Sequence, residues 1–173
     1  ANLDPKVASL YYAADRRHAL KEIKSKLEEG KILISDRYTT SNMGHQCGKL
    51  ESTEERLEMA SWLETLEYNL LELPKPNSVI FLYMPTNVAN KLKAERPETA
   101  IDAHEPNQTH LINAERAYLE LSDHYNWHQV NCSANNIDPR SIDEIHQEVL
   151  SHAIKTIEPN EESSTYQTSS HNS

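Results

Sequence analysis

Apolar residues recur at helical spacing over residues 5–29, 53–73 and 104–123, over a final stretch after Pro139, and in a shorter stretch over 86–93. Unbroken apolar runs lie between them at Ile32–Ile34, Val79–Tyr83 and Trp127–Cys132, as is typical of strands buried on both faces. Strands that alternate with helices predict an α/β fold, in which a parallel sheet is flanked by helices in three layers.

Capping residues set the limits of these elements. Asp4 followed by Pro5 predicts a helix start, and Ser52 with Glu55 fits a capping box. Asp138-Pro139 is predicted to cap the final helix. A helix end is predicted at Gly30, a stop at Pro74–Asn77, and a loop or broken turn over residues 39–51.

Length and composition favour one domain over residues 1–157. The remaining polar residues, 158–173, contain five serines, two threonines and no aliphatic residue, which predicts a disordered tail. The net charge of −10 argues against general binding to nucleic acid polymers or anionic membranes. Two cysteines without zinc-type spacing, and no apolar span or signal sequence, favour a reducing cytoplasmic location.

Two clusters of residues suggest chemistry. Tyr12 and Arg16 lie one helical turn apart, so a ring that could stack on a base shares a face with a guanidinium that could bind a carbonyl. Asp36 and Arg37 follow the first apolar run, at the strand edge where α/β sheets bind ligands, and suit Mg²⁺ and a phosphate respectively. The alternatives are a core tyrosine with a surface arginine, and an Asp–Arg pair that caps the strand.

The order of these motifs resembles the thymidylate kinase (dTMP kinase) family over about residues 3–155. Two motifs carry most of the likeness: Tyr-Ala-Ala-Asp-Arg at 12–16 and Ser-Asp-Arg-Tyr-Thr-Thr-Ser-Asn at 35–42. Three further segments agree in order, at 73–82, 102–105 and 117–121. The resemblance implies a nucleoside monophosphate kinase fold, and transfer of the ATP γ-phosphoryl to dTMP with Mg²⁺ as cofactor.

The resemblance also implies roles for individual residues. Tyr12 corresponds to the aromatic that stacks on thymine, Arg16 to the arginine at its carbonyl, and Arg37 to the arginine that holds the dTMP phosphate. Asp36 corresponds to the acid near the phosphates and the metal. The other positions implied to line the nucleotide site are Asn42, His45, Gln46 and Tyr118. A lid over about 92–104 would supply a catalytic cation, for which Arg96, Lys91 and Lys93 are the nearest candidates.

The chain departs from the family pattern at two places. It has three glycines and no Gly-x-x-x-x-Gly-Lys phosphate loop, which relatives carry on a first strand placed centrally in their sheet. Glu115 and Asn113 also stand where relatives often have arginine. The chain is therefore expected to be N-terminally incomplete: a fragment of an enzyme, a truncated product, or a degenerate binding module.

Two other interpretations of function and one of assembly remain open. A deoxynucleoside kinase would use a similar Asp-Arg-Tyr stretch but phosphorylate a sugar hydroxyl. A non-catalytic nucleotide-binding or interaction module would bind dTMP without transfer. The resemblance also makes a homodimer plausible, with helix 53–73, including Trp62 and Leu66, as one possible contact face.

Overall fold

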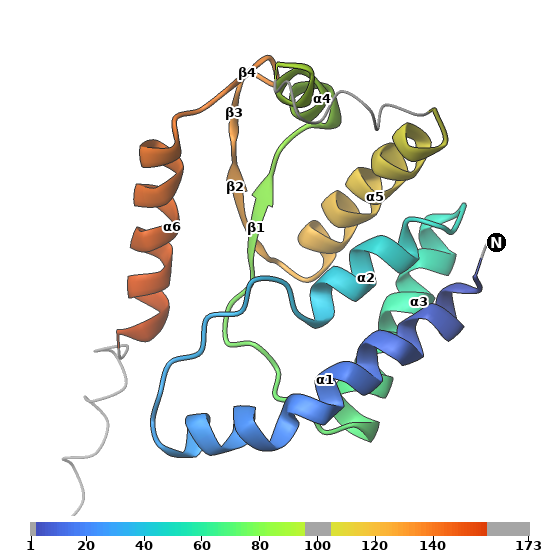
Figure 1. Cartoon of the computed structure of the whole chain (residues 1–173), viewed down its shortest axis with the longest axis vertical. Coiled ribbons are helices and arrows are strands. Elements are labelled where there is room, and N and C mark those ends of the chain that lie inside the picture. The colour runs from blue at the N-terminus through green and yellow to red at the C-terminus, as the bar shows by residue number, and fades with distance from the viewer. Residues whose placement is uncertain (1–2, 96–104, 159–173) are drawn as a thin grey trace, which may run out of the picture.

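The computed structural model describes residues 3–95 and 105–158 as a helical assembly around a small sheet (Figure 1). A π-helix, η1, continues α3 without a break. In chain order the elements are α1 (Pro5–Glu28), α2 (Thr39–Cys47), α3 (Thr53–Glu64), η1 (Thr65–Leu70), β1 (Ile80–Tyr83), α4 (Thr86–Ala94), α5 (Glu105–His124), β2 (His128–Asn131), β3 (Ser133–Ala134), β4 (Asp138–Pro139) and α6 (Ile142–Ile157).

The sheet is parallel, as the strand–helix alternation predicted. β1 pairs with β2 in the register Ile80 to His128 and Tyr83 to Asn131. The two strands lie between α6 on one side and α2 and α5 on the other (Figure 1). The α/β class and parallel pairing are therefore seen, but the described part of the sheet contains only these two parallel strands, with β3 and β4 forming a separate antiparallel pair.

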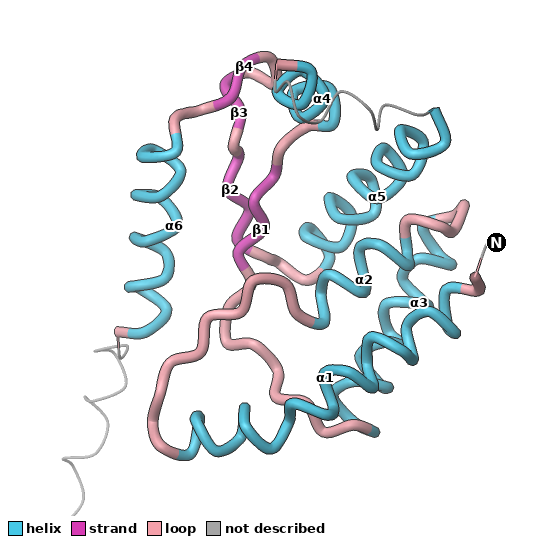
Figure 2. Tube along the Cα trace, in the orientation of Figure 1, coloured by secondary structure: helices cyan, strands magenta, loops and turns pink. Residues whose placement is uncertain are grey.

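The strand predicted at Ile32–Ile34 was wrong. Residues 31–38 form an extended loop between α1 and α2 (Figure 2), and the Ile34 side chain is 91% exposed. A strand forms only where its N–H and C=O groups find a partner ladder, and within the described residues no strand runs beside this segment. The apolar run therefore lacks the hydrogen bonds that would hold it in a sheet.

The loop predicted over residues 39–51 was also wrong, because residues 39–47 form α2. This helix packs against α1, α3 and α5. Its inward positions include Met43 and Cys47, which join the core, but also the polar residues Asn42 and Gln46. Polar side chains at buried positions hid the helical period that an apolar face would have shown.

The apolar core lies where α2, α3 and α5 meet. Its fully buried members are Met43, Cys47, Met59, Ala60, Leu63, Ala117 and Leu121, and Trp62 and Trp127 pack against them. Gly48 allows α2 to approach α5, since a Cβ there would lie 2.9 Å from the Cα of Ala114. The helix that carries Asn42, His45 and Gln46 is thus packed against its neighbours.

The helix caps follow local sequence rules with one exception. The Asp4 carboxylate accepts from the backbone N–H of Lys6 and Val7, and Ser52 with Glu55 forms the predicted capping box. Gly30 adopts the left-handed conformation expected after a helix end, with φ of +75°. The exception is the last helix: Asp138-Pro139 forms β4, and Ser141 caps α6.

Some predictions fall outside the described residues. These are most of the lid at 92–104, Arg96 within it, and all but the first residue of the tail at 158–173. Among the helices that the structure describes, none is both long and apolar enough to cross a membrane.

Candidate functional site

A buried carboxylate joins α1, α2 and η1. Glu67 of η1 is 1% exposed and accepts from Arg16 twice, from Nε at 2.5 Å and from Nη2 at 2.6 Å. Its Oε1 also accepts from Asn42 Nδ2 at 3.1 Å. Two residues predicted from separate motifs therefore meet at a single acid that the sequence did not single out.

Arg37 lies just before the first turn of α2, and its side chain runs along that helix. Its Nε donates to Ser41 Oγ at 2.8 Å, and its Nη2 lies 2.7 Å from His45 Nε2. It does not pair with Asp36, so the interpretation of these two residues as a strand-capping ion pair is wrong. Arg37 is exposed, and within residues 3–95 and 105–158 its Nη1 contacts no acceptor, which leaves donors for a further anion.

The surroundings of His45 favour the neutral form of its imidazole. Burial lowers the pKa of His45, and the positive charge of Arg37 lowers it further. A neutral imidazole can accept the hydrogen bond from Arg37 at Nε2. The His45 ring also stacks on His110 at 5.9 Å between ring centroids and meets the edge of Tyr118.

Tyr118 of α5 lies flat against α2, and Gly44 makes this possible. A Cβ at Gly44 would overlap the Tyr118 ring, and the same ring stacks on Phe81 of β1 with 5.4 Å between centroids. The Tyr118 hydroxyl donates to the Ser41 carbonyl at 3.3 Å. This tyrosine therefore links the sheet to the helix that carries Asn42, His45 and Gln46.

Two buried amide oxygens on α2 lack donors. Asn42 and Gln46, each 4% exposed, are spaced four residues apart on one face of the helix. In the described part of the chain, neither Asn42 Oδ1 nor Gln46 Oε1 accepts a hydrogen bond. Buried acceptors of this kind are costly unless a ligand or water donates to them.

Tyr12 and Asp36 remain in contact with solvent. Tyr12 is 56% exposed on α1, one turn before Arg16, so its ring is not a core residue. Asp36 is exposed, and no side chain in the described ranges pairs with it. The same ranges hold no cluster of three or more potential metal ligands. A lone exposed carboxylate still fits Mg²⁺, which is usually held by one or two carboxylates together with substrate phosphates.

Sequence reasoning missed Glu67 and Arg56, and it noted Glu115 only as a departure from the family pattern, without its structural role. Glu115 accepts from Tyr83 Oη at 2.8 Å and from the Thr86 backbone N–H at 3.1 Å, so it holds the start of α4. An acid in a helix is normally taken for a solvent-facing residue. The available signal was the position of Glu115 on the apolar side of α5.

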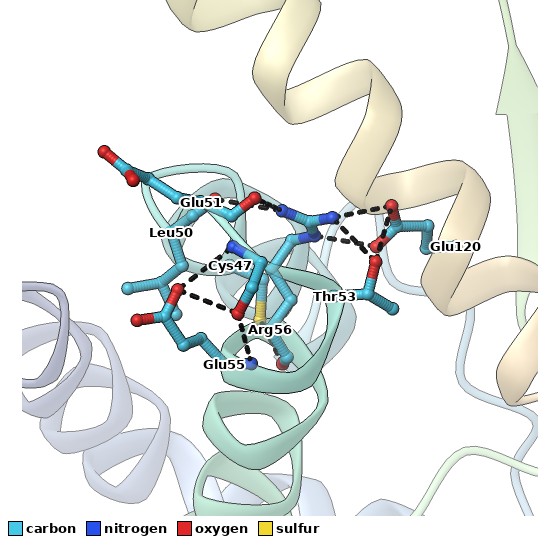
Figure 3. A network of polar contacts seen from close by, with 8 residues as sticks. Cys47, Leu50, Glu51, Thr53, Glu55, Arg56 and Glu120 are labelled. Atoms are coloured by element: carbon cyan, nitrogen blue, oxygen red, sulfur yellow. Dashed lines mark hydrogen bonds and ion pairs between the residues drawn. The ribbon is translucent and has the colours of Figure 1, made fainter.

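Arg56 of α3 ties the loop between α2 and α3 to α5 (Figure 3). All five of its N–H groups donate: to both carboxylate oxygens of Glu120 at 2.7 Å, to the carbonyls of Leu50 and Glu51 at 3.0 Å, and to Thr53 Oγ1 at 3.1 Å. Nearby, burial raises the pKa of the Cys47 thiol to about 12, which makes it a poor nucleophile.

A cavity of about 390 Å³ lies on a different side of α2, between η1 and the starts of β1 and β2. Its walls include Thr40, Tyr68, Ser78, Trp127 and His152. None of the sequence-predicted site residues lines it. The predicted residues instead gather along α1 and α2, over Glu67 and Arg37.

Comparison with known proteins found a matching family and several curated relatives. The family model described as "Thymidylate kinase" matches residues 1–149. Thymidylate kinase of Bifidobacterium longum subsp. infantis is 31% identical over 138 residues, which are 69% of this chain and 57% of that protein. Thymidylate kinase of Limosilactobacillus fermentum is 29% identical over 80% of this chain and 62% of that protein.

A vertebrate relative agrees with the bacterial ones. Thymidylate kinase of Danio rerio is 27% identical over 150 residues, which are 86% of this chain and 62% of that protein. The chain thus spans about three fifths of the length of the curated relatives it matches. Since the family model covers most of the sequence, the chain belongs to the thymidylate kinase family.

Proposed function

We propose that the protein acts in transfer of the ATP γ-phosphoryl to dTMP, giving dTDP and ADP. An oxygen of the dTMP phosphate attacks the γ-phosphorus of ATP, and the bond to the bridging oxygen of ADP breaks. Family membership supports the reaction. The single structural observation that carries the acceptor side is Arg37, which is held by Ser41 and His45 while its Nη1 contacts no acceptor in the described residues.

The proposed dTMP site has two ends, one that binds the phosphate and one that binds the base. Arg37 would bind the phosphate of dTMP through charge-assisted hydrogen bonds, which are the strong ones. Tyr12 would stack on thymine, while Arg16, Asn42 and Gln46 would face its polar edge. Tyr118 and His45 would support the wall between these ends. No protein nucleophile is needed, because positioning and charge neutralisation carry phosphoryl transfer.

The proposal also assigns residues to Mg²⁺ and to the transferred phosphoryl group. Asp36 would hold Mg²⁺ together with nucleotide phosphates, and the ion would neutralise charge that develops during transfer. We assign a catalytic role to Arg96 in the lid, outside the described residues.

The proposal includes a cytoplasmic location and a homodimer. Leu66 is buried within the chain, so it cannot contribute to the dimer face suggested by the sequence.

Calorimetric titration of the chain with dTMP tests the acceptor site directly. We expect dTMP to bind, and Arg37→Ala to weaken binding by about 10- to 100-fold, since a charge-assisted hydrogen bond contributes about 1.5–3 kcal/mol. Arg17→Ala is the matched control, because Arg17 is an exposed arginine of α1 without a site role. Equal affinity of Arg37→Ala and the wild-type chain would rule out the phosphate assignment.

The choice of ligand separates the alternatives. Thymidine that binds as tightly as dTMP would favour a deoxynucleoside kinase, because that enzyme accepts a neutral sugar hydroxyl. An assay of ADP release with dTMP and ATP on the same preparation tests transfer itself. Binding of dTMP without any ADP release, on a protein verified to contain its complete reading frame, would favour the non-catalytic module.

A further inference from the structure

We propose that Glu67 sets the hydrogen-bonding pattern that the site offers to a base, and so acts as a positioning residue for choice between pyrimidines. The inference rests on the proposed function for the identity of the ligand. Glu67 itself would not touch the nucleotide. It would act through Arg16 and Asn42, whose polar groups it holds.

The geometry fixes the guanidinium of Arg16. The two Glu67 oxygens accept from Nε and Nη2 in a fork, which sets the plane of the guanidinium as well as its place. No acceptor among the described residues contacts Arg16 Nη1, and the Arg16 side chain is 16% exposed. The guanidinium therefore keeps donors on the edge that Glu67 does not occupy.

The charge of Glu67 also orients the amide of Asn42. An ionised carboxylate can only accept hydrogen bonds, so Asn42 must turn its NH₂ group toward Glu67. The same Nδ2 lies 3.5 Å from the Ser9 carbonyl. Asn42 Oδ1 then points to the other side of the amide, where it is buried and lacks a donor within the described chain.

The surroundings of Glu67 supply partners for both of its oxygens. Glu67 is buried, and its oxygens receive three N–H groups, two of them from a cation. Its helix supports the arrangement: η1 is a π-helix, and the Leu71 N–H reaches back to the Leu66 carbonyl at 3.0 Å. Such turns are often found at functional sites.

The resulting pattern discriminates the keto pyrimidines, thymine and uracil, from cytosine. Arg16 offers a donor, which suits a carbonyl at the pyrimidine 4-position and opposes an amino group there. Asn42 offers an acceptor, which suits a protonated N3 and opposes an unprotonated one. Thymine and uracil have the carbonyl and the N3–H, whereas cytosine has the amino group and a bare N3. Glu67 thus favours the keto pyrimidines, because unpaired buried polar groups reject the wrong base strongly.

The test compares dTMP with dCMP in calorimetric titrations of the full chain. The wild type should bind dTMP at least tenfold more tightly than dCMP. Glu67→Gln should reduce that ratio at least threefold, because a carboxamide can donate and lets Asn42 turn over. Glu64→Gln is the control: it removes a charge at the neighbouring end of α3, where Glu64 contacts Lys75 and Tyr125 and lies away from Arg16.

A second variant and an NMR measurement keep each outcome decisive. Arg16→Lys keeps a cation beside Glu67 but removes the forked pair of hydrogen bonds. It should also reduce the ratio of dTMP affinity to dCMP affinity, and it replaces Glu67→Gln as the test if that variant does not fold. The Arg16 Nε–H resonance should be sharp and slow to exchange with solvent in the wild type. An unprotected resonance, or a wild-type ratio in the variants, would overturn the role of Glu67.

The two proposals can fail separately. A chain that binds dTMP, with an unchanged ratio in Glu67→Gln and Arg16→Lys, refutes the inference and leaves the proposed function standing. A chain that binds neither nucleotide refutes the proposed function, and the base-choice role of Glu67 falls with it. A protected Arg16 Nε–H in such a chain would show only that Glu67 holds the Arg16 guanidinium.

Discussion

Replacing Arg56 by methionine should loosen the contact between α5 and the loop that follows α2, next to the candidate site. The Arg56 side chain is 3% exposed, and each of its five N–H groups has an acceptor (Figure 3). Methionine fills much of the volume but donates nothing. The carboxylate of Glu120 and two backbone carbonyls in the loop between α2 and α3 then lose their donors.

The expected loss is about 3 kcal/mol in the free energy of unfolding. Removing one partner of a buried ion pair usually costs about 3–5 kcal/mol, because the other charge stays uncompensated. Glu120 is 28% exposed and can regain water, which places this pair at the lower end. For a domain of this size, about 3 kcal/mol corresponds to a fall in Tm of roughly 6–12 °C.

Urea unfolding followed by circular dichroism measures this loss, with Glu120→Gln as the milder comparison. Hydrogen bonds from Arg56 hold the pKa of Glu120 below its ordinary value of 4.5. The stabilisation is therefore complete above about pH 4.5 and is lost as the pH falls through the lowered folded-state pKa. The gap between wild type and Arg56→Met should narrow on acidification. A gap below about 1 kcal/mol at pH 7 would refute the reasoning.

Three further predictions concern the same helices. Gly44→Ala should destabilise the chain by about 1–3 kcal/mol through overlap with Tyr118, although alanine is the better helix former, and a second change of Tyr118→Leu should recover most of the loss in urea unfolding. Because the folded-state pKa of His45 is lowered, its contribution to stability is present above about pH 6.5 and lost as the pH falls; His45→Asn should remove this part of the pH dependence, and an unchanged profile would contradict it. Glu115→Gln should speed amide hydrogen exchange at the start of α4 and leave exchange in α1 unaffected, since only α4 loses an anion at its N-terminus.

Local rules predicted the parts of the fold that depend on neighbouring residues. Asp4, Ser52 and Glu55 cap their helices as expected, because a cap involves only three or four residues. The parallel pairing of β1 and β2 also followed from the pattern. The run Ile32–Ile34 fits a strand by composition, but a strand depends on a neighbour that no local pattern supplies.

The resemblance supplied most of the candidate residues, the buried Asn42 and Gln46 among them, but not Glu67. Tyr12, Arg16 and Arg37 are candidates because a family motif carries them. Glu67 was missed because a carboxylate inside an apolar helix is ordinarily solvent-facing, and only the three-dimensional arrangement brings Arg16 to it over 51 positions of sequence. The helical nature of α2 was missed because its inward residues are polar.

Because of the backbone conformation at Arg37, selection for stability and selection for nucleotide binding should favour different residues at this position. Its φ of +67° lies in the left-handed region, which costs a side-chain-bearing residue about 1 kcal/mol and costs glycine almost nothing. Directed evolution for heat resistance alone should therefore drift toward glycine at this position. A library sorted for nucleotide capture should keep the arginine, so comparing the two pools would separate what this loop does from what merely keeps it folded.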